Sequence, residues 1–157
     1  MLLLLTACAA GTPGARVVPS PVDTDDGAVD VTVRFPRTVT RGSTVEVMVV
    51  ITGREGIATY DEAGIDVAMN ARGLWNVQVT PIGGEATSSG FTGLVGGIQT
   101  RGRRFGPGTQ LGFAARFDIA ANAPIHELPI QVSASLTGGR PSKSFVRNYV
   151  ASVEPQR

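Results

Sequence analysis

Apolar and polar residues alternate along most of the chain beyond residue 28. A period of two places successive side chains on opposite faces, which is the pattern of a strand buried on one side. The stretch VDVTVRF shows it clearly, with a valine or phenylalanine at every second position. Seven segments carry this alternation or a related apolar run: 29–35, 44–52, 65–71, 74–81, 109–119, 128–137 and 144–153.

The apolar positions of these segments predict the core. We expect inward side chains at Val29, Val31, Val33, Phe35, Val45, Val47, Val49, Ile51, Trp75, Val77, Val79, Leu111, Phe113, Ala115, Phe117, Ile119, Ile130, Val132, Ala134 and Leu136. Segment 144–153 is apolar on both faces, so its pattern does not identify its buried side. No segment sustains the 3.6-residue period of a helix. The pattern therefore predicts an all-β fold, a two-sheet antiparallel β-sandwich of about seven strands.

The turns and strand starts resemble those of a known family. The matching motifs are Arg41-Gly42-Ser43-Thr44, Gly73-Leu74-Trp75-Asn76-Val77, Gly106-Pro107-Gly108-Thr109, Ala121-Asn122-Ala123-Pro124 and Leu128-Pro129-Ile130-Gln131-Val132. Through them, residues 29–137 are similar to the bacterial immunoglobulin-like domains of the NEW3 and CARDB type. The resemblance implies an immunoglobulin-like sandwich that acts as an accessory or surface module and brings no catalytic residues. Segment 82–104 departs from the family because it is longer than such domains usually carry there.

Length and charge restrict the possible functions. The 157 residues suffice for one domain of ordinary size. Charged residues make up 17% of the chain and the net charge is +1, so no strong positive field gathers polyanions. We therefore expect no nucleic-acid partner.

The N-terminal tetrad Leu5-Thr6-Ala7-Cys8 resembles the lipobox of bacterial lipoproteins. The resemblance implies cleavage by a signal peptidase before Cys8 and attachment of a diacylglyceryl group to its thiol. Cys8 is the only cysteine, and an isolated thiol on an exported protein is unusual unless it is modified. The apolar run is short and lacks a basic flank. The alternative is a buried N-terminal segment with an incidental cysteine.

These features divide the chain into three parts. Residues 1–7 are a signal-peptide remnant, residues 8–28 hold the lipidated Cys8 and a flexible tether, and residues 29–154 form the immunoglobulin-like domain. The tether is rich in Gly, Ala, Pro, Ser and Asp, without apolar periodicity. Its acidic cluster Asp23, Asp25 and Asp26 has the wrong spacing for a calcium loop. We expect a solvated linker there and no metal site.

Catalytic motifs are missing from the sequence. His126 is the only histidine, and no G-x-S-x-G elbow accompanies it, so a loop histidine is expected. Nothing in the spacing selects a carboxylate pair from Glu46, Asp61, Glu62 and Asp66. No phosphate-binding or dinucleotide motif is present. The sequence predicts no catalytic residue, no metal and no cofactor, and hence a protein that is not an enzyme.

The densest positive charge lies in the stretch RGRRFG. Arg101, Arg103 and Arg104 surround a glycine there, and Phe105 follows them. Guanidinium groups at a turn bind carboxylate or phosphate groups, so these four residues are the candidate binding site. The alternative is a solvated hairpin turn.

The glycine-rich span 82–98 has two interpretations. Long loops on sandwich scaffolds often carry binding function, which makes the span a candidate recognition surface. In the alternative, its apolar side chains cover the outer side of strand 44–52. The covering residues would be Phe91, Leu94, Val95 and Ile98, and the covered ones Met48 and Val50.

These expectations lead to a functional hypothesis. The chain is a lipid-anchored protein of the cell envelope, facing the periplasm or the exterior, with a non-catalytic structural or binding role. Its partners would be the membrane, through the lipid, and an envelope polysaccharide or protein. The alternative function is a carbohydrate- or envelope-polymer-binding module that assists a partner enzyme or transporter. The sequence does not indicate an oligomeric state.

Overall fold

The computed structural model describes residues 16–18, 27, 29–91 and 93–156. The predicted lipobox with Cys8 and the acidic cluster Asp23, Asp25 and Asp26 lie outside these residues. Eleven strands and no helix occur within the described part of the chain. No helix in this part is therefore long and apolar enough to cross a membrane.

The strands follow one another along the chain in this order: β1 Arg16–Val18, β2 Val29–Arg34, β3 Thr38–Thr40, β4 Thr44–Gly53, β5 Tyr60–Asn70, β6 Leu74–Ile82, β7 Glu85–Ser89, β8 Val95–Phe105, β9 Gln110–Ile119, β10 Glu127–Thr137 and β11 Lys143–Glu154. All seven segments predicted from the alternation are strands. They correspond to β2, β4, β5, β6, β9, β10 and β11.

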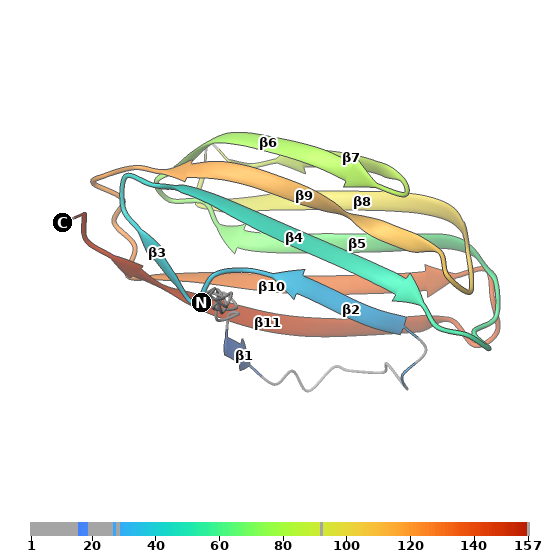
Figure 1. Cartoon of the computed structure of the whole chain (residues 1–157). Helices are drawn as coiled ribbons and strands as arrows, with labels where there is room; N and C mark the ends of the chain where they lie inside the picture. The colour runs from blue at the N-terminus through green and yellow to red at the C-terminus, as the bar shows by residue number, and fades with distance from the viewer. Residues whose placement is uncertain (1–15, 19–26, 28, 92, 157) are drawn as a thin grey trace, which may run out of the picture.

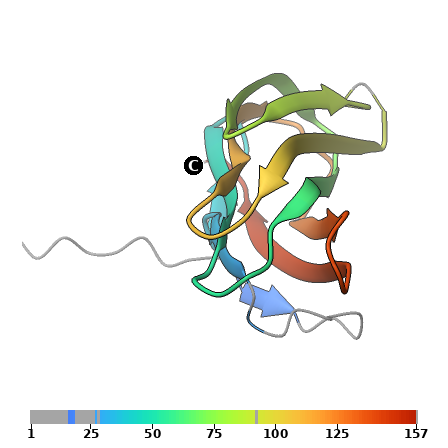
Figure 2. The ribbon, with the colours of Figure 1, turned by 90° about the vertical axis from the view of Figure 1, so that its right-hand side faces the viewer.

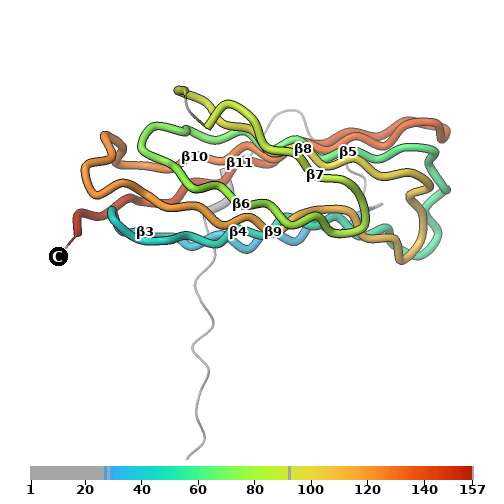
Figure 3. Tube along the Cα trace, turned by 90° about the horizontal axis from the view of Figure 1, so that it is seen from above, coloured from blue at the N-terminus to red at the C-terminus, as the bar shows by residue number. Residues whose placement is uncertain are grey.

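The strands form two stacked sheets (Figure 1). One has four strands in the order β2-β4-β9-β6, and the other has the order β1-β11-β10-β5-β8-β7, with β3 also paired to β11. The end-on view and the view from above both show two layers (Figure 2, Figure 3). Neighbouring strands are antiparallel except for β3 and β11, which are parallel. The predicted all-β, two-sheet sandwich is confirmed.

The strand order follows the immunoglobulin plan. In that plan strands A, B, E and D form one sheet and G, F and C the other. Here β2, β4, β9 and β6 take the first set of places, and β11, β10 and β5 take the second. The hairpin of β7 and β8 is inserted between β6 and β9 and extends the second sheet, because β8 pairs with β5.

The core lies between the sheets, as the alternation predicts for most strands. Buried side chains include Val45, Val47, Val49, Ile51, Leu111, Phe113, Ala115, Phe117, Ile119, Ile130, Val132, Ala134 and Leu136. In β11, whose buried side the pattern did not identify, the inward residues are Phe145, Tyr149, Ala151 and Val153. The prediction fails for Trp75, which is exposed.

The glycine-rich span is neither a long loop nor a cover for β4. Ile98 is buried in the core from β8, whereas Leu94 and Val95 are 62% and 64% exposed. The ring of Phe91 lies against Gly96 of the same hairpin. Met48 and Val50 lie on β4, in the sheet that does not pair with this hairpin. Met48 is half-buried there and Val50 is buried. The span was missed as a hairpin because glycine, serine and threonine hide its alternation.

Three residues of the predicted flexible tether are part of the sandwich. Arg16–Val18 form β1, which pairs in antiparallel fashion with Asn148 to Val150 of β11. The chain is therefore attached to the edge of the larger sheet well before the domain boundary expected at residue 29.

Candidate functional site

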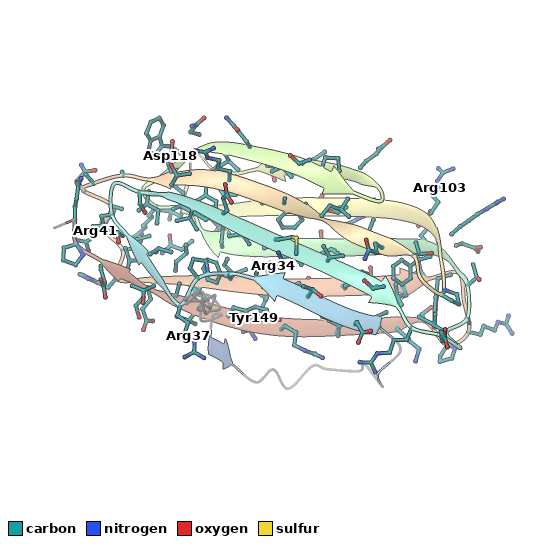
Figure 4. The ribbon with its side chains drawn as sticks, viewed as in Figure 1. Arg34, Arg37, Arg41, Arg103, Asp118 and Tyr149 are labelled. Carbon is teal, nitrogen blue, oxygen red and sulfur yellow. The ribbon has the colours of Figure 1, made fainter. Side chains whose placement is uncertain are left out.

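The outer face of the four-stranded sheet is the candidate binding surface. Alternation along β4 and β9 sends Val47, Val49, Phe113 and Ala115 into the core. The intervening side chains must then point outward. We call this surface the β4–β9 face. It looks toward the viewer in Figure 4, where Arg34 and Asp118 are labelled on it.

Strand register arranges the part of the β4–β9 face nearest Trp75 in three rows of neighbours. The rows are Arg34, Met48, Ala114 and Thr80; then Glu46, Arg116 and Gln78; then Thr44, Asp118 and Trp75. The first two rows line an open groove of about 890 Å³, which all four strands help to form.

The groove shares two features with protein interfaces, an apolar centre and a border that carries arginine. Met48 and Ala114 provide an apolar floor, and Arg34, Glu46 and Arg116 surround it. Interfaces commonly have an apolar centre with a polar rim, and they are enriched in methionine, arginine and aromatic residues. The face can therefore exclude water at its centre and make directed polar contacts at its border.

Arg34 and Arg116 are available for such contacts. Among the described residues, the ion pairs are Arg54 with Asp30 and Arg101 with Asp66, and neither involves these two side chains. Glu46 lies directly opposite Arg116 in the pairing of β4 with β9, yet the two groups form no ion pair.

A β-bulge in β6 places Trp75 at the end of this face. Trp75 pairs with Asp118 and Gln78 pairs with Arg116. Between these two pairs, β6 therefore has one residue more than β9. The extra residue reverses the alternation, because Trp75 and Gln78 then share the outer side. Trp75 is 58% exposed, which corrects the prediction that it faces the core.

Asp118 holds the bulge together. Its Oδ1 accepts a hydrogen bond from Thr44 Oγ1 at 2.6 Å, and its Oδ2 accepts one from Asn76 Nδ2 at 2.9 Å. Asn76 has a φ of 52°, in the left-handed region that asparagine tolerates better than most residues. The carboxylate thus ties the strained residue of β6 to β4 and β9.

The same contacts keep Asp118 ionised. The hydrogen bond from Thr44 and then the one from Asn76 lower the pKa of Asp118, because both donors favour the charged carboxylate. Partial burial opposes this shift, and the nearby positive charge of Arg116 adds to it. Both oxygens already have donors, so we assign Asp118 a positioning role.

The four residues of the predicted arginine site have different environments in the structure. Phe105 is 1% exposed in the core, so its ring is unavailable to a ligand. Arg101 is bound through Nη2 to both carboxylate oxygens of Asp66, at 2.9 and 3.2 Å. Arg103 and Arg104 are exposed near the end of β8, and Arg104 has a φ of 55°. The stretch belongs to β8, and the turn follows it, where Thr109 N donates to Gly106 O at 3.0 Å.

His126 is an exposed residue directly before β10, as expected of a loop histidine. Its Nδ1 lies 3.4 Å from Arg41 Nη2, which also donates to the carbonyl of Ile125 at 3.0 Å. Within the described residues, no group of three His, Cys, Asp or Glu side chains is placed to hold a metal ion.

Comparisons with known proteins give structural matches only. No protein-family model and no curated protein sequence matches the chain. A cohesin module from a Clostridium perfringens family 33 glycoside hydrolase is 14% identical with a TM-score of 0.57, covering 82% of this chain and 98% of the module. The seventh ScaB type I cohesin from Pseudobacteroides cellulosolvens is 11% identical with a TM-score of 0.52, covering 82% and 94%.

A third match is AvmM, which catalyses macrocyclization in alchivemycin A biosynthesis. It is 11% identical with a TM-score of 0.49, covering 81% of this chain and 90% of AvmM. At such identities, the likeness to the two cohesin modules shows the β-sandwich fold alone and leaves the activity to be argued from the site.

Proposed function

We propose that this protein is a lipid-anchored, non-catalytic module of the cell envelope that binds another protein through the β4–β9 face. The composition of the groove supports this proposal above all. An apolar floor at Met48 and Ala114 lies between the guanidinium groups of Arg34 and Arg116, with the exposed Trp75 beyond. Tryptophan and arginine are the side chains that most often dominate binding energy at interfaces.

The proposed anchor is the lipid on Cys8, in the tetrad Leu5-Thr6-Ala7-Cys8. It would hold the sandwich at the periplasmic or exterior side of a membrane. A binding module at a fixed surface needs no reaction centre of its own, which agrees with the lack of catalytic motifs in the sequence.

In-cell photo-crosslinking tests the binding face. A photoreactive residue is placed at Thr80, on the face, and in a second variant at Ser135, an exposed position on the outer side of the other sheet. We expect a discrete adduct from Thr80 only, and its loss when Met48→Glu is added. Equal adducts from both positions, or none from Thr80, would contradict the proposal.

Trp75 favours a second candidate function, binding of an envelope polysaccharide. An exposed tryptophan presents a large apolar ring face, against which the apolar C–H side of a sugar ring can pack. Retention on purified envelope polysaccharide should then fall for Trp75→Ala and stay unchanged for Leu94→Ala, which removes another exposed apolar side chain. Polysaccharide binding by Arg103 and Arg104 stays a prediction. Joint replacement of the two arginines by Ser tests it separately from Trp75.

A further inference from the structure

The β4–β9 face is complementary to itself. A two-fold axis can run parallel to the strands, midway between β4 and β9, with a second copy stacked on the face. This axis places β4 over the partner's β9 and keeps each row over the same row. Closed dimers use such isologous contacts, in which residue i meets residue j and j meets i.

The apolar floor lies at the centre of this arrangement. Met48 and Ala114 are direct neighbours in one row, so the axis places Met48 over the partner's Ala114 and Ala114 over the partner's Met48. The two grooves then face each other, and the charged side chains at their borders make the contact between the copies.

The charges fit it too. Glu46 and Arg116 are neighbours in the next row, so Glu46 comes over the partner's Arg116 and Arg116 over the partner's Glu46. Arg34 comes over the partner's Thr80, and Asp118 over the partner's Thr44, so no like charges are opposed. Within the part of the chain that the structure describes, neither Glu46 nor Arg116 has an ion pair.

The face is large enough for a specific contact. Four strands about 4.8 Å apart and about nine residues long give a face of roughly 19 by 30 Å, or about 1,100 Å² for the two copies together. Biological interfaces generally bury more than about 1,000 Å².

We propose that the occupant of the β4–β9 face is a second copy of this chain, held by reciprocal Glu46–Arg116 contacts at the borders of the two opposed grooves. This inference rests on the proposed function, because it names the protein that the face binds. Charge complementarity selects a second copy over an unrelated acidic or basic partner, since the two charges alternate within one row.

Charge exchange tests the proposal. The unprocessed, non-lipidated 157-residue chain is studied by sedimentation under reducing conditions, so that Cys8 cannot link chains. We expect the mass to rise with concentration from 16.3 kDa toward twice that value. Glu46→Arg brings positive charges face to face across the dimer, and Arg116→Glu brings negative charges face to face. Each variant should therefore weaken dimerisation at least tenfold.

An equimolar mixture of the two variants should restore dimerisation. In the mixed dimer the arginine introduced by Glu46→Arg meets the glutamate introduced by Arg116→Glu on the other chain, so opposite charges face each other again. Gln99→Arg, on the outer side of the other sheet, is the matched control and should leave dimerisation unchanged.

Three results would overturn the proposal: a wild type that stays monomeric at millimolar concentration, dimerisation that neither single variant weakens, or a mixture that stays monomeric. The crosslinking experiment separates this failure from failure of the proposed function. An adduct from Thr80 with a protein of different mass would uphold binding by the face and exclude the second copy as its occupant.

Discussion

Asp118 on β9 accepts a hydrogen bond at 2.9 Å from Asn76, the residue of β6 whose backbone adopts φ 52°. The two residues are 42 positions apart in the chain, and their contact fixes the bulge that turns Trp75 outward. One side of the candidate surface therefore depends on a single carboxylate and amide.

Replacement of Asn76 should separate the backbone requirement from the hydrogen bond. A β-branched residue is strained at positive φ, so Asn76→Val should lower the free energy of unfolding by about 1–3 kcal/mol. Glycine accepts this conformation freely, so Asn76→Gly should cost less. Urea denaturation measures both, and equal losses would show that the positive φ does not matter.

Acid titration should reveal the contribution of Asp118. Its folded-state pKa is lowered, so its contribution to stability is fully present above the unfolded-state pKa of about 3.9 and is lost as pH falls through the lower folded value. The gap in Tm between the wild type and Asp118→Asn should be constant above about pH 5 and should shrink below about 3.9. A gap that widens on acidification would refute this assignment.

The buried hydroxyl of Thr100 should be dispensable. Thr100 is 0% exposed, and its Oγ1 has no hydrogen-bond partner among the residues that the structure describes. Valine has nearly the same shape without the unsatisfied polar atom, so Thr100→Val should raise the free energy of unfolding by about 1 kcal/mol. Thr87→Val, at an exposed position of the same hairpin, controls for β-propensity and should change stability less. Both are compared by urea denaturation, and a loss of stability at position 100 would contradict the prediction.

Lipidation of Cys8 is directly measurable. Cells fed a palmitate analogue should label the wild type, and Cys8→Ser should abolish the label because the only thiol of the chain is gone. Persistent labelling of Cys8→Ser, or none of the wild type, would remove the anchor from the proposal.

Local alternation was sufficient to predict the seven strands of the immunoglobulin plan. In β9 every second residue from Leu111 to Ile119 is apolar and buried, so the sequence pattern and the packing agree. The same rule failed at Trp75, because an extra residue in β6 is set by a contact with Asp118 on another strand. The asparagine directly after the tryptophan was the one available signal, since asparagine tolerates a left-handed backbone.

The candidate face could not be predicted from the sequence, for a different reason. Glu46 and Arg116 were visible as outward residues of their strands, but their adjacency depends on which strands pair and in what register. The arginine stretch shows the reverse error. Charge density drew attention to Arg101 and Phe105, whereas the structure assigns one to an ion pair and the other to the core.

The short strand β1 has a mechanical consequence for an anchored protein. Arg16 comes only eight positions after Cys8, and a fully extended chain of that length reaches about 28 Å, whereas Val29 comes 21 positions after Cys8, which would reach about 70 Å. With Cys8 lipidated, as proposed, the pairing of β1 with β11 would confine each sandwich to a thin layer above the bilayer. Two such molecules would then meet by lateral diffusion in that layer, where a high local concentration favours even a weak contact.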